Sequence, residues 1–518
     1  MKTLSVEMLG DLKEVAANQI RDALRLTDVS YADVRVELAE GVSAYAEDGL
    51  PRGLGQDFGL SLGVRVVAGE IVQASGYEGR ILGVNDFADF GNILLHAIHI
   101  AHTRARDNAR FKAFYTNSWG ALGTSIVGTQ LAPIQVREDL VLGKWKIDPR
   151  NVEPARLLEY LVHISRATKA KFPTLIRVMV GAHLSLERKL FASTEGALID
   201  QTYAFAEGTP LLFAKSGNND VVDLYHTLGN QVGAEALLEN VNSFGVDYEG
   251  FVLKLAQEAV ALAKAPPLKT SDKPVVVVTD PDFNALVAHE VLAHPSELDR
   301  AMKWEAGYAG RSWFFHTPDD TVVGKQICSP LVTVFSDPTQ EGAYGHYLYD
   351  DEGTPARRVY HVRNGVYHEF LNSRQTAAMF VAQPNGHYLA SDASVVPVIR
   401  MSCSVFAPGV SDPQNILKEV EDGYYVVGNR IPAVAESREN FRIAARLVYE
   451  IRNGELGQLF RDGGIMSDSK EFFMSIDAVG NDFKIFPIPN CGKGQPMQTR
   501  RVGNGGPTIR SRAYLAGK

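Results

Sequence analysis

Apolar and polar positions follow two different rhythms along the first half of the chain. Near the start, apolar residues recur every three or four positions, which predicts an amphipathic helix. Runs in which apolar and polar residues alternate one by one predict strands. The expected helices are 6–27, 86–107, 153–170 and 234–264, and the expected strands are 31–40, 42–46, 58–67, 174–186 and 189–203. This mixture of elements predicts an N-terminal domain of the α+β or α/β class, of which α/β is preferred.

Two stretches without periodicity interrupt this pattern. Residues 115–153 are rich in Gly, Thr, Ser and Pro, so extended structure or a long loop is expected there. Residues 265–274 have the proline and polar content typical of a domain boundary. We therefore divide the chain into an N-terminal domain, 1–268, and a C-terminal domain, 269–518.

The second half consists of short alternating segments separated by turn residues. Asn364-Gly365 and Asn453-Gly454 are strong signals of two-residue hairpin turns. The expected strands are 331–336, 344–349, 359–363, 366–370, 395–401, 424–427, 441–451 and 455–459. The pattern predicts a β-rich C-terminal domain, and the protein as a whole is expected to be α+β.

The C-terminal domain opens with a strand and a helix. Val275 to Val278 form a β-branched run, which is typical of a strand covered on both faces. Asp280 can cap a helix through its carboxylate, and Pro281 suits the first helical position, where its missing N–H does no harm. An amphipathic helix, packed against the C-terminal sheet, is expected to follow.

This helix carries a candidate metal site formed by His289, Glu290 and His294. Two histidines around a glutamate are the pattern of zinc peptidases, in which the imidazoles bind the metal and the carboxylate handles the proton of a water. The histidines are five positions apart, which separates them by about 140° on an ideal α-helix. A π-bulge or an unwound end would bring them together, and Pro295 favours such a distortion. The sequence therefore predicts an irregular turn at His294.

A metal site needs a third ligand, for which there are four candidates. Glu297 follows closely, although the proline leaves its direction open. Cys328 and Cys403 lie in apolar segments, where a cysteine usually behaves as a small buried hydrophobe. Cys491 is expected in a glycine-rich loop beside Lys493, whose positive charge favours the thiolate that binds metals. Cys491 is therefore the preferred third ligand.

Composition and charge limit the classes of function. A net charge of −9 and a pI near 5.9 argue against general nucleic-acid binding, which needs a basic surface. No apolar run approaches the length of a membrane span, and the first residues do not form a signal peptide. Three cysteines in 518 residues provide no disulfide framework. A cytoplasmic protein that does not bind membranes is expected.

A series of motifs runs along the C-terminal half, namely His289-Glu-Val-Leu-Ala-His294 with Glu297 and Asp299, Asp350-Asp-Glu-Gly353, Arg400-Met-Ser, Pro408-Gly409, Cys491-Gly-Lys-Gly-Gln495 and Pro507-Thr-Ile-Arg510. In these motifs and their order, this half resembles the TldD/PmbA metallopeptidase family. In the N-terminal half the likeness is limited to Gly63-Val-Arg-Val66. Because the chain retains the histidine motif, it resembles the TldD-like branch, in contrast to the PmbA-like branch that lacks this motif.

The resemblance implies a function and a set of partners. It implies that His289, His294 and Cys491 bind one Zn²⁺ per chain and that Glu290 acts on the water. It also implies a soluble dimer, either with a second copy or with a PmbA-like subunit, that cleaves unfolded or modified peptides. The sequence departs from the family pattern at Ala293, where glycine is frequent, at Pro295, and at Cys403, where asparagine is expected.

Further polar residues have open roles. The acidic cluster of Asp350, Asp351 and Glu352 could hydrogen-bond to groups behind the metal ligands, attract a peptide N-terminus, or form a solvated turn before a glycine. Arg400 could hold the substrate through its planar fork or form an internal ion pair. Two alternative functions also stay open, namely a non-catalytic peptide-binding or assembly subunit with a structural metal, and a zinc amidohydrolase for small amides. Glu290 argues against the former, since a structural zinc does not need such a carboxylate.

Overall fold

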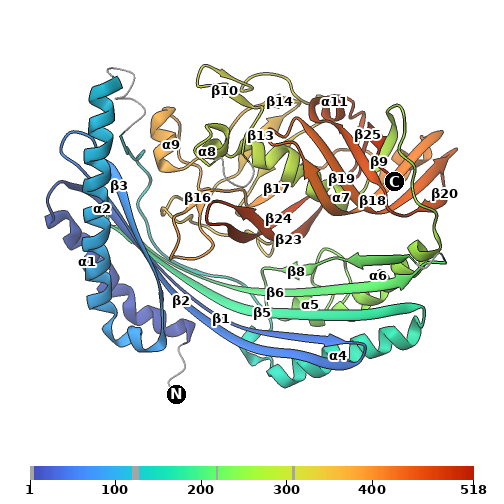
Figure 1. Cartoon of the computed structure of the whole chain (residues 1–518), viewed down its shortest axis with the longest axis horizontal. Coiled ribbons are helices and arrows are strands. Elements are labelled where there is room, and N and C mark those ends of the chain that lie inside the picture. The colour runs from blue at the N-terminus through green and yellow to red at the C-terminus, as the bar shows by residue number, and fades with distance from the viewer. Residues whose placement is uncertain (1–4, 120–127, 218–219, 306–309, 518) are drawn as a thin grey trace.

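A sheet of long, curved strands dominates the N-terminal half (Figure 1). The structure is a computed structural model that describes residues 5–119, 128–217, 220–305 and 310–517. The sheet has the order β3-β2-β1-β5-β6-β4, with β7 and β8 paired to β6, and its pairs are antiparallel except for β4–β6. Its strands are β1 (Val29–Glu47), β2 (Leu50–Ala68), β3 (Ala74–Leu82), β4 (Glu138–Leu142), β5 (Leu175–Ser193), β6 (Leu198–Lys215), β7 (Val221–Tyr225) and β8 (Leu228–Asn230).

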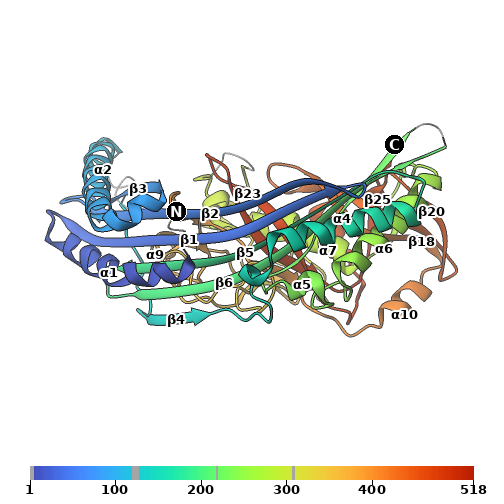
Figure 2. The same ribbon diagram turned by 90° about the horizontal axis from the view of Figure 1, so that it is seen from below.

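Helices cover the two ends of this sheet in separate groups. At one end, α1 and α2 pack on the apolar side chains of β1 and β2, and at the other end α4 and α6 enclose a second core (Figures 1 and 2). The helices are α1 (Lys13–Asp22), α2 (Phe90–Trp119), α4 (Pro154–Lys171), α5 (Glu235–Leu238) and α6 (Tyr248–Lys264). Short 3₁₀ turns span Val6–Leu12, Ala23–Arg25, Val84–Asp89 and Pro149–Asn151.

Two N-terminal strands, β1 and β5, are longer than the sequence pattern predicted. The expected strands 31–40 and 42–46 are one strand, β1. Likewise β5 continues through Glu187 and Arg188, where a break was expected, and ends only at Ser193. Glu187 lines a cavity between the halves of the chain and Arg188 donates to Asp200 on β6, so these two polar residues do not mark a turn.

Two predicted helices are also divided. The first, 6–27, is α1 between two 3₁₀ turns, and the last, 234–264, is split into α5 and α6 by a loop. Of the predicted loop 115–153, residues 120–127 lie outside the described part. The remainder holds the end of α2, strand β4 and a 3₁₀ turn.

The C-terminal half contains two larger sheets that are mainly antiparallel. One has the order β14-β13-β12-β17-β24-β23 and the other β18-β9-β25-β21-β19-β20, with β22 paired to β25. The pairs β17–β24 and β9–β18 are parallel. The larger strands are β9 (Val275–Thr279), β12 (Val334–Ser336), β13 (Val359–Arg363), β17 (Cys403–Phe406), β18 (Asp422–Val434), β19 (Asn440–Arg452), β20 (Glu455–Phe460), β21 (Gly464–Asp468), β23 (Lys484–Lys493), β24 (Gln498–Gly506) and β25 (Ile509–Leu515).

Short elements complete this half. They are α7 (Pro281–Val287), α8 (Leu298–Ala301), α9 (Arg374–Met379), α10 (Pro413–Lys418), α11 (Ser469–Met474), β10 (Phe315–Thr317), β11 (Asp320–Thr321), β14 (Val366–Tyr367), β15 (Tyr388–Leu389), β16 (Val398–Ile399) and β22 (Ala478–Val479). One core of buried side chains, from Leu268 to Leu515, surrounds α7. The α+β class expected from the sequence is confirmed.

The predicted hairpin turns are confirmed, whereas other expectations for this half are wrong. Asn364-Gly365 and Asn453-Gly454 join antiparallel neighbours, with φ between 49° and 84° as two-residue turns of this kind require. Segment 344–349 forms no strand, because it lies in turns between the two halves of the protein. Residues 484–515 form three strands that the sequence pattern did not indicate.

The C-terminal half lies over the sheet of long strands, with β23 and β24 on the side nearest to it (Figure 1). Among the described residues, no helix combines the length and apolar character required to cross a bilayer.

Candidate metal centre

The helix that carries the histidines changes its winding at Ala288, one residue before the first of them. The Asp280 carboxylate accepts a hydrogen bond from the N–H of Phe283 at 2.8 Å and caps α7, as predicted. The chain then continues as a π-helical segment, Ala288–Ala293, and as a 3₁₀ turn, His294–Ser296. The irregular turn expected at His294 is confirmed. Because a π-turn places residues i and i+5 on one face, the two imidazole centroids lie only 4.7 Å apart.

Cys491 completes the group from a distant part of the sequence. Its Sγ lies 3.7 Å from Nε2 of His294, and the three potential ligand atoms of His289, His294 and Cys491 all lie within 4.8 Å of one another. Cys491 is part of β23, so the prediction of a loop is wrong. The pairing of β23 with β24 is irregular between Ile488 and Cys491, and this irregularity accompanies the turn of the cysteine toward the helix.

The outer nitrogen of each imidazole has a polar partner. Nδ1 of His289 lies 3.0 Å from Oδ1 of Asn504, and Nδ1 of His294 lies 3.1 Å from Oε2 of Glu297. Such contacts fix the ring orientation and leave Nε2 available to a metal. Glu297 therefore lies behind a candidate ligand, and Cys491 is the candidate third donor. Sequence reasoning missed Asn504, whose role depends on the parallel alignment of β24 with β17.

The charges around the sulfur favour a thiolate. Burial raises the pKa of Cys491, but the positive charges of His289, His294 and Arg400 outweigh this effect and hold the pKa well below its usual range. Burial lowers the pKa of His289, yet the neighbouring thiolate more than compensates and raises it to about 9. Two imidazoles and a thiolate suit zinc, so the residues present fit this metal.

Glu290 lies beside the three donors and lines the cavity. Its Oε1 is 4.0 Å from Nε2 of His289, and its Oε2 is 3.7 Å from Nη2 of Arg438. Burial raises the pKa of Glu290. The positive charges of His294, His289 and Arg438 lower the pKa by more than burial raises it, so the net shift is downward. The carboxylate is therefore ionised and can accept a proton near the metal position. Arg438 was not among the residues singled out in the sequence.

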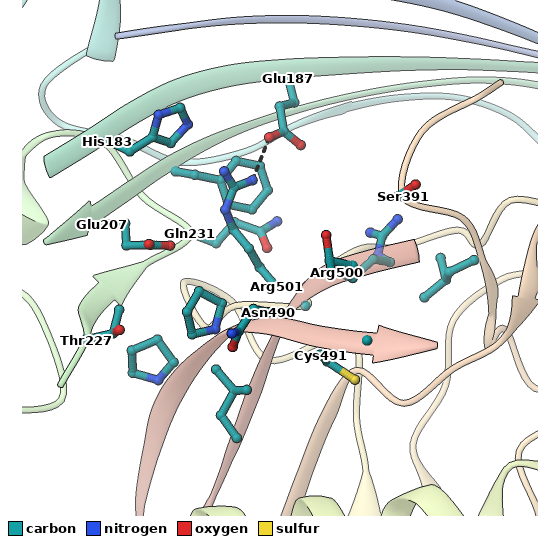
Figure 3. A pocket seen from close by; sticks show the side chains of 18 of the residues that line it. His183, Glu187, Glu207, Thr227, Gln231, Ser391, Asn490, Cys491, Arg500 and Arg501 are labelled. Atoms are coloured by element: carbon teal, nitrogen blue, oxygen red, sulfur yellow. Dashed lines mark hydrogen bonds and ion pairs between the residues drawn. The ribbon is translucent and has the colours of Figure 1, made fainter. Parts of the chain in front are cut away.

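The metal position opens into a cavity of about 1110 Å³ between the two halves. Figure 3 shows side chains of β5 and β6, among them Glu187 and Glu207, facing Cys491 and its neighbours on β23 across this space. Arg501 on β24 donates to Glu187 at 2.7 Å and so connects the two walls. The cavity is therefore polar and is built by both halves of the chain.

Lys493 lies behind the candidate ligands, where it contacts two carboxylates. Its Nζ donates to Asp299 at 2.6 Å and lies 3.2 Å from Oε2 of Glu297, and both contacts are buried. Its charge is thus balanced by two carboxylates. Arg400 is also fully buried and donates to the backbone carbonyl oxygens of Cys491 and Gln498. Arg400 therefore supports the cysteine strand and does not line the cavity.

The acidic cluster connects the two halves of the chain. Glu352 accepts a hydrogen bond from Arg65 on β2 at 2.7 Å, and Asp351 accepts one from Arg35 on β1 at 3.2 Å. Asp350 accepts backbone N–H groups within its own turn. Because Asp350 and Glu352 are only 3% and 1% exposed, the interpretation of this segment as a solvated turn is wrong.

The two remaining cysteines lie away from the metal ligands. Cys328 and Cys403 are fully buried, and burial raises the pKa of both thiols. Cys403 donates to the carbonyl oxygen of Tyr344 at 3.0 Å. Both behave as the small buried hydrophobes that their apolar flanks predicted.

A histidine pair and a thiolate beside a carboxylate, at the wall of a large cavity, are typical of a metal-dependent hydrolase. Residues 272–515 match the domain described as the PmbA/TldA metallopeptidase C-terminal domain, so this part of the chain belongs to the TldD/PmbA metallopeptidase family.

Two relatives carry related names. A protein of Methanocaldococcus jannaschii named a metalloprotease is 30% identical over 283 residues, which cover 54% of this chain and 59% of the relative. A Saccharolobus solfataricus protein named a zinc metalloprotease TldD homolog is 25% identical over 52% of this chain and 57% of its own length. The alignments thus span less than two thirds of both relatives.

The fold is shared over nearly the whole chain with a solved structure. TldE from Thermococcus kodakarensis superposes with a TM-score of 0.68 at 18% identity, covering 96% of this chain and 99% of that one.

Proposed function

We propose that this chain is a zinc-dependent peptidase that cleaves unfolded or modified peptides. The observation that carries the proposal is the placement of the His289, His294 and Cys491 donor atoms within 4.8 Å of one another at the wall of the cavity. Glu290, in contact with the same cavity, adds the carboxylate that peptide hydrolysis needs.

Each residue of the site has a defined task in this mechanism. His289, His294 and Cys491 would hold one zinc ion. A zinc ion held there would supply Lewis acidity for hydrolysis of the peptide bond. Glu290 accepts the proton of the attacking water and passes it to the leaving amine. Asn504 and Glu297 keep the imidazoles oriented through their Nδ1 atoms.

The substrate is proposed to lie along β23 as an added strand. β23 is an edge strand of its sheet, and its residues 487–492 line the cavity next to the metal ligands. A peptide that pairs with a strand edge is recognised through its backbone, which allows varied sequences. Only an extended segment can bind in this way, so unfolded peptides are the expected substrates.

The proposal extends to the assembly and location of the protein. A dimer, either of two copies or with a PmbA-like subunit, and a cytoplasmic location are proposed on the strength of family membership. Light scattering of the purified protein, alone and mixed with a PmbA-like subunit, distinguishes a homodimer from a heterodimer.

Two other functions fit the site less well. A non-catalytic binding subunit would not need Glu290 at the cavity wall beside the ligands. An amidohydrolase for small amides could use the same donors, but a cavity of about 1110 Å³ exceeds the roughly 300–1,000 Å³ of common small-molecule pockets. The cavity size therefore favours peptides.

The decisive experiment combines metal analysis with hydrolysis of an unfolded protein and of its folded form. We expect about one zinc per chain and faster cleavage of the unfolded form. Glu290→Gln should retain zinc and lose turnover by roughly 10²–10⁴-fold, as for other general bases. The matched control is Glu471→Gln, an exposed glutamate on α11.

Three results would contradict parts of the proposal. Full activity in Glu290→Gln would remove this residue from the mechanism. Equal cleavage of the folded and unfolded forms would exclude strand addition. Absence of zinc after reconstitution would favour the binding-subunit alternative.

A further inference from the structure

The backbone of the metal helix lacks one donor at Glu290. In a π-turn, the carbonyl oxygen of residue i accepts a hydrogen bond from the N–H of residue i+5. His289 follows this rule, because its carbonyl accepts the N–H of His294. For Glu290 the corresponding residue is Pro295, which has no N–H.

Arg438 supplies the missing donor from a distant part of the sequence. Its Nε donates to the carbonyl oxygen of Glu290 at 3.2 Å, across 148 positions of the chain. The same guanidinium approaches the side chain, since Nη2 lies 3.7 Å from Oε2 of Glu290. One planar group thus contacts both the backbone and the carboxylate of a single residue, which a point charge such as lysine could not do.

These contacts determine how the Glu290 carboxylate is oriented. While Oε2 faces Arg438, Oε1 lies 4.0 Å from Nε2 of His289, on the side of the metal position. The two oxygens therefore have different surroundings. One faces the guanidinium, and the other faces Nε2 of His289, one of the candidate metal donors.

Arg438 is itself held firmly, at an energetic cost. It is 3% exposed and adopts φ of 69°, a conformation that non-glycine residues rarely adopt. Its N–H donates to Ala435 at 2.9 Å, its carbonyl accepts from Ser469 at 2.6 Å, and Nη1 donates to the carbonyl oxygens of Ala435 and Glu436 at 3.3 Å. Strained backbone and buried charge persist where the surrounding structure imposes them, and they cluster at functional sites.

We infer that Arg438 is a positioning residue, which orients Glu290 toward the attacking water and stabilises the proline-interrupted turn between His289 and His294. The first part of this inference rests on the proposed function, because it concerns the proton transfer by Glu290. The second part concerns the geometry of the ligand pair and can be tested without turnover.

The experiment compares Arg438→Ala, Arg438→Lys and the unaltered protein, each saturated with zinc. Arg442→Ala is the matched control, since Arg442 is exposed on the adjacent strand β19. We expect kcat of Arg438→Ala on an unfolded protein to fall about 10–100-fold, the effect typical of residues that orient a metal site, while KM stays unchanged. Low concentrations of guanidinium should restore part of kcat to Arg438→Ala and leave the control unaffected.

The outcomes separate positioning from a merely structural role. Unchanged kcat in Arg438→Ala would overturn the inference. A decrease in kcat that equals the decrease in the fraction of folded protein, and that guanidinium does not reverse, would overturn it as well. If Arg438→Ala does not fold, Arg438→Lys decides the question. Reduced kcat in that variant supports the inference, whereas full kcat overturns it, because an ammonium group cannot make both contacts.

Zinc release into a chelator keeps this test distinct from a test of the proposed function. If the unaltered protein holds zinc but cleaves no peptide, the proposed function fails. Release from Arg438→Ala should still be about 10-fold faster than from the unaltered protein, as expected when support of a ligand is lost. Equal release rates would overturn the inference on the turn.

Discussion

Nδ1 of His294 lies 3.1 Å from the Glu297 carboxylate, although Pro295 separates the two residues in the chain. The 3₁₀ turn at His294–Ser296 brings the chain back so that Glu297 lies behind the imidazole. Glu297 also accepts from Nε of Arg300 at 3.1 Å and lies close to Lys493. One buried carboxylate thus contacts a candidate metal ligand and balances two cations.

Replacing Glu297 should weaken zinc binding without removing a ligand. In Glu297→Gln the amide no longer balances Arg300 and Lys493, and its contact with His294 is weaker. We expect the zinc dissociation constant to rise about 10–100-fold. A chelator competition titration measures this, with Glu471→Gln as the control. Unchanged affinity would show that the imidazole is held by packing alone.

Replacing Cys491 should remove zinc from the protein. Because a serine hydroxyl is a far weaker zinc ligand than a thiolate, Cys491→Ser should lose most of its metal. Cys328→Ser is the matched control, since Cys328 is equally buried and lies outside the ligand group. Mass spectrometry under native conditions gives the zinc content. Retention of one zinc per chain in Cys491→Ser would require a different third ligand.

The contact between Arg65 and Glu352 should stabilise the association of the two halves. Arg65 bridges Asp33 and Glu352, at 2.6 Å and 2.7 Å, and all three side chains are buried. Removing one partner leaves a buried charge unbalanced, so Glu352→Gln should lower the free energy of unfolding by about 3–5 kcal/mol. Urea denaturation measures this change.

A double variant provides the control for this contact. Arg65→Met with Glu352→Gln should cost less than the sum of the two single changes, because the residues interact directly. Additive effects would show that the contact contributes nothing of its own.

Asp282 should make stability dependent on pH on the acid side. Burial raises the pKa of its carboxyl, but His226, at 2.9 Å, and Arg446, at 2.8 Å, outweigh this and hold the pKa well below its unfolded value of 3.8. Its stabilising contribution is therefore complete above about pH 4. It decreases as the pH falls from there toward the lower pKa of the folded state.

Unfolding experiments on Asp282→Asn at two pH values test this dependence. The difference in unfolding free energy from the unaltered protein should be largest at pH 7 and smaller at pH 3. Asp422→Asn, at an exposed position, should show no such trend. A difference that is independent of pH would mean that Asp282 stabilises the fold without its charge.

Local features of the fold were accessible from the sequence because they depend on neighbouring residues. The cap at Asp280, the hairpin turns at Asn364-Gly365 and Asn453-Gly454, and the irregular turn before Pro295 all follow from side chains within a few positions. The break expected at Glu187 and Arg188 does not occur, because β5 runs on through both residues and Glu187 faces the cavity. From the sequence alone, polar residues in a strand are mistaken for a turn, because the part of the chain that faces them across the cavity is not known.

For the site, the sequence by itself identified the polar residues of the helix as candidates. Only the tertiary structure decided which distant residues surround them. His289, Glu290 and His294 share one short segment, so their spacing already required a distorted helix. Cys491 was the preferred third ligand, yet its position on a strand became apparent only from the pairing of β23 with β24. Asn504 and Arg438 approach from 215 and 148 positions away. Contacts of that range arise from packing of the whole chain, which local periodicity does not record.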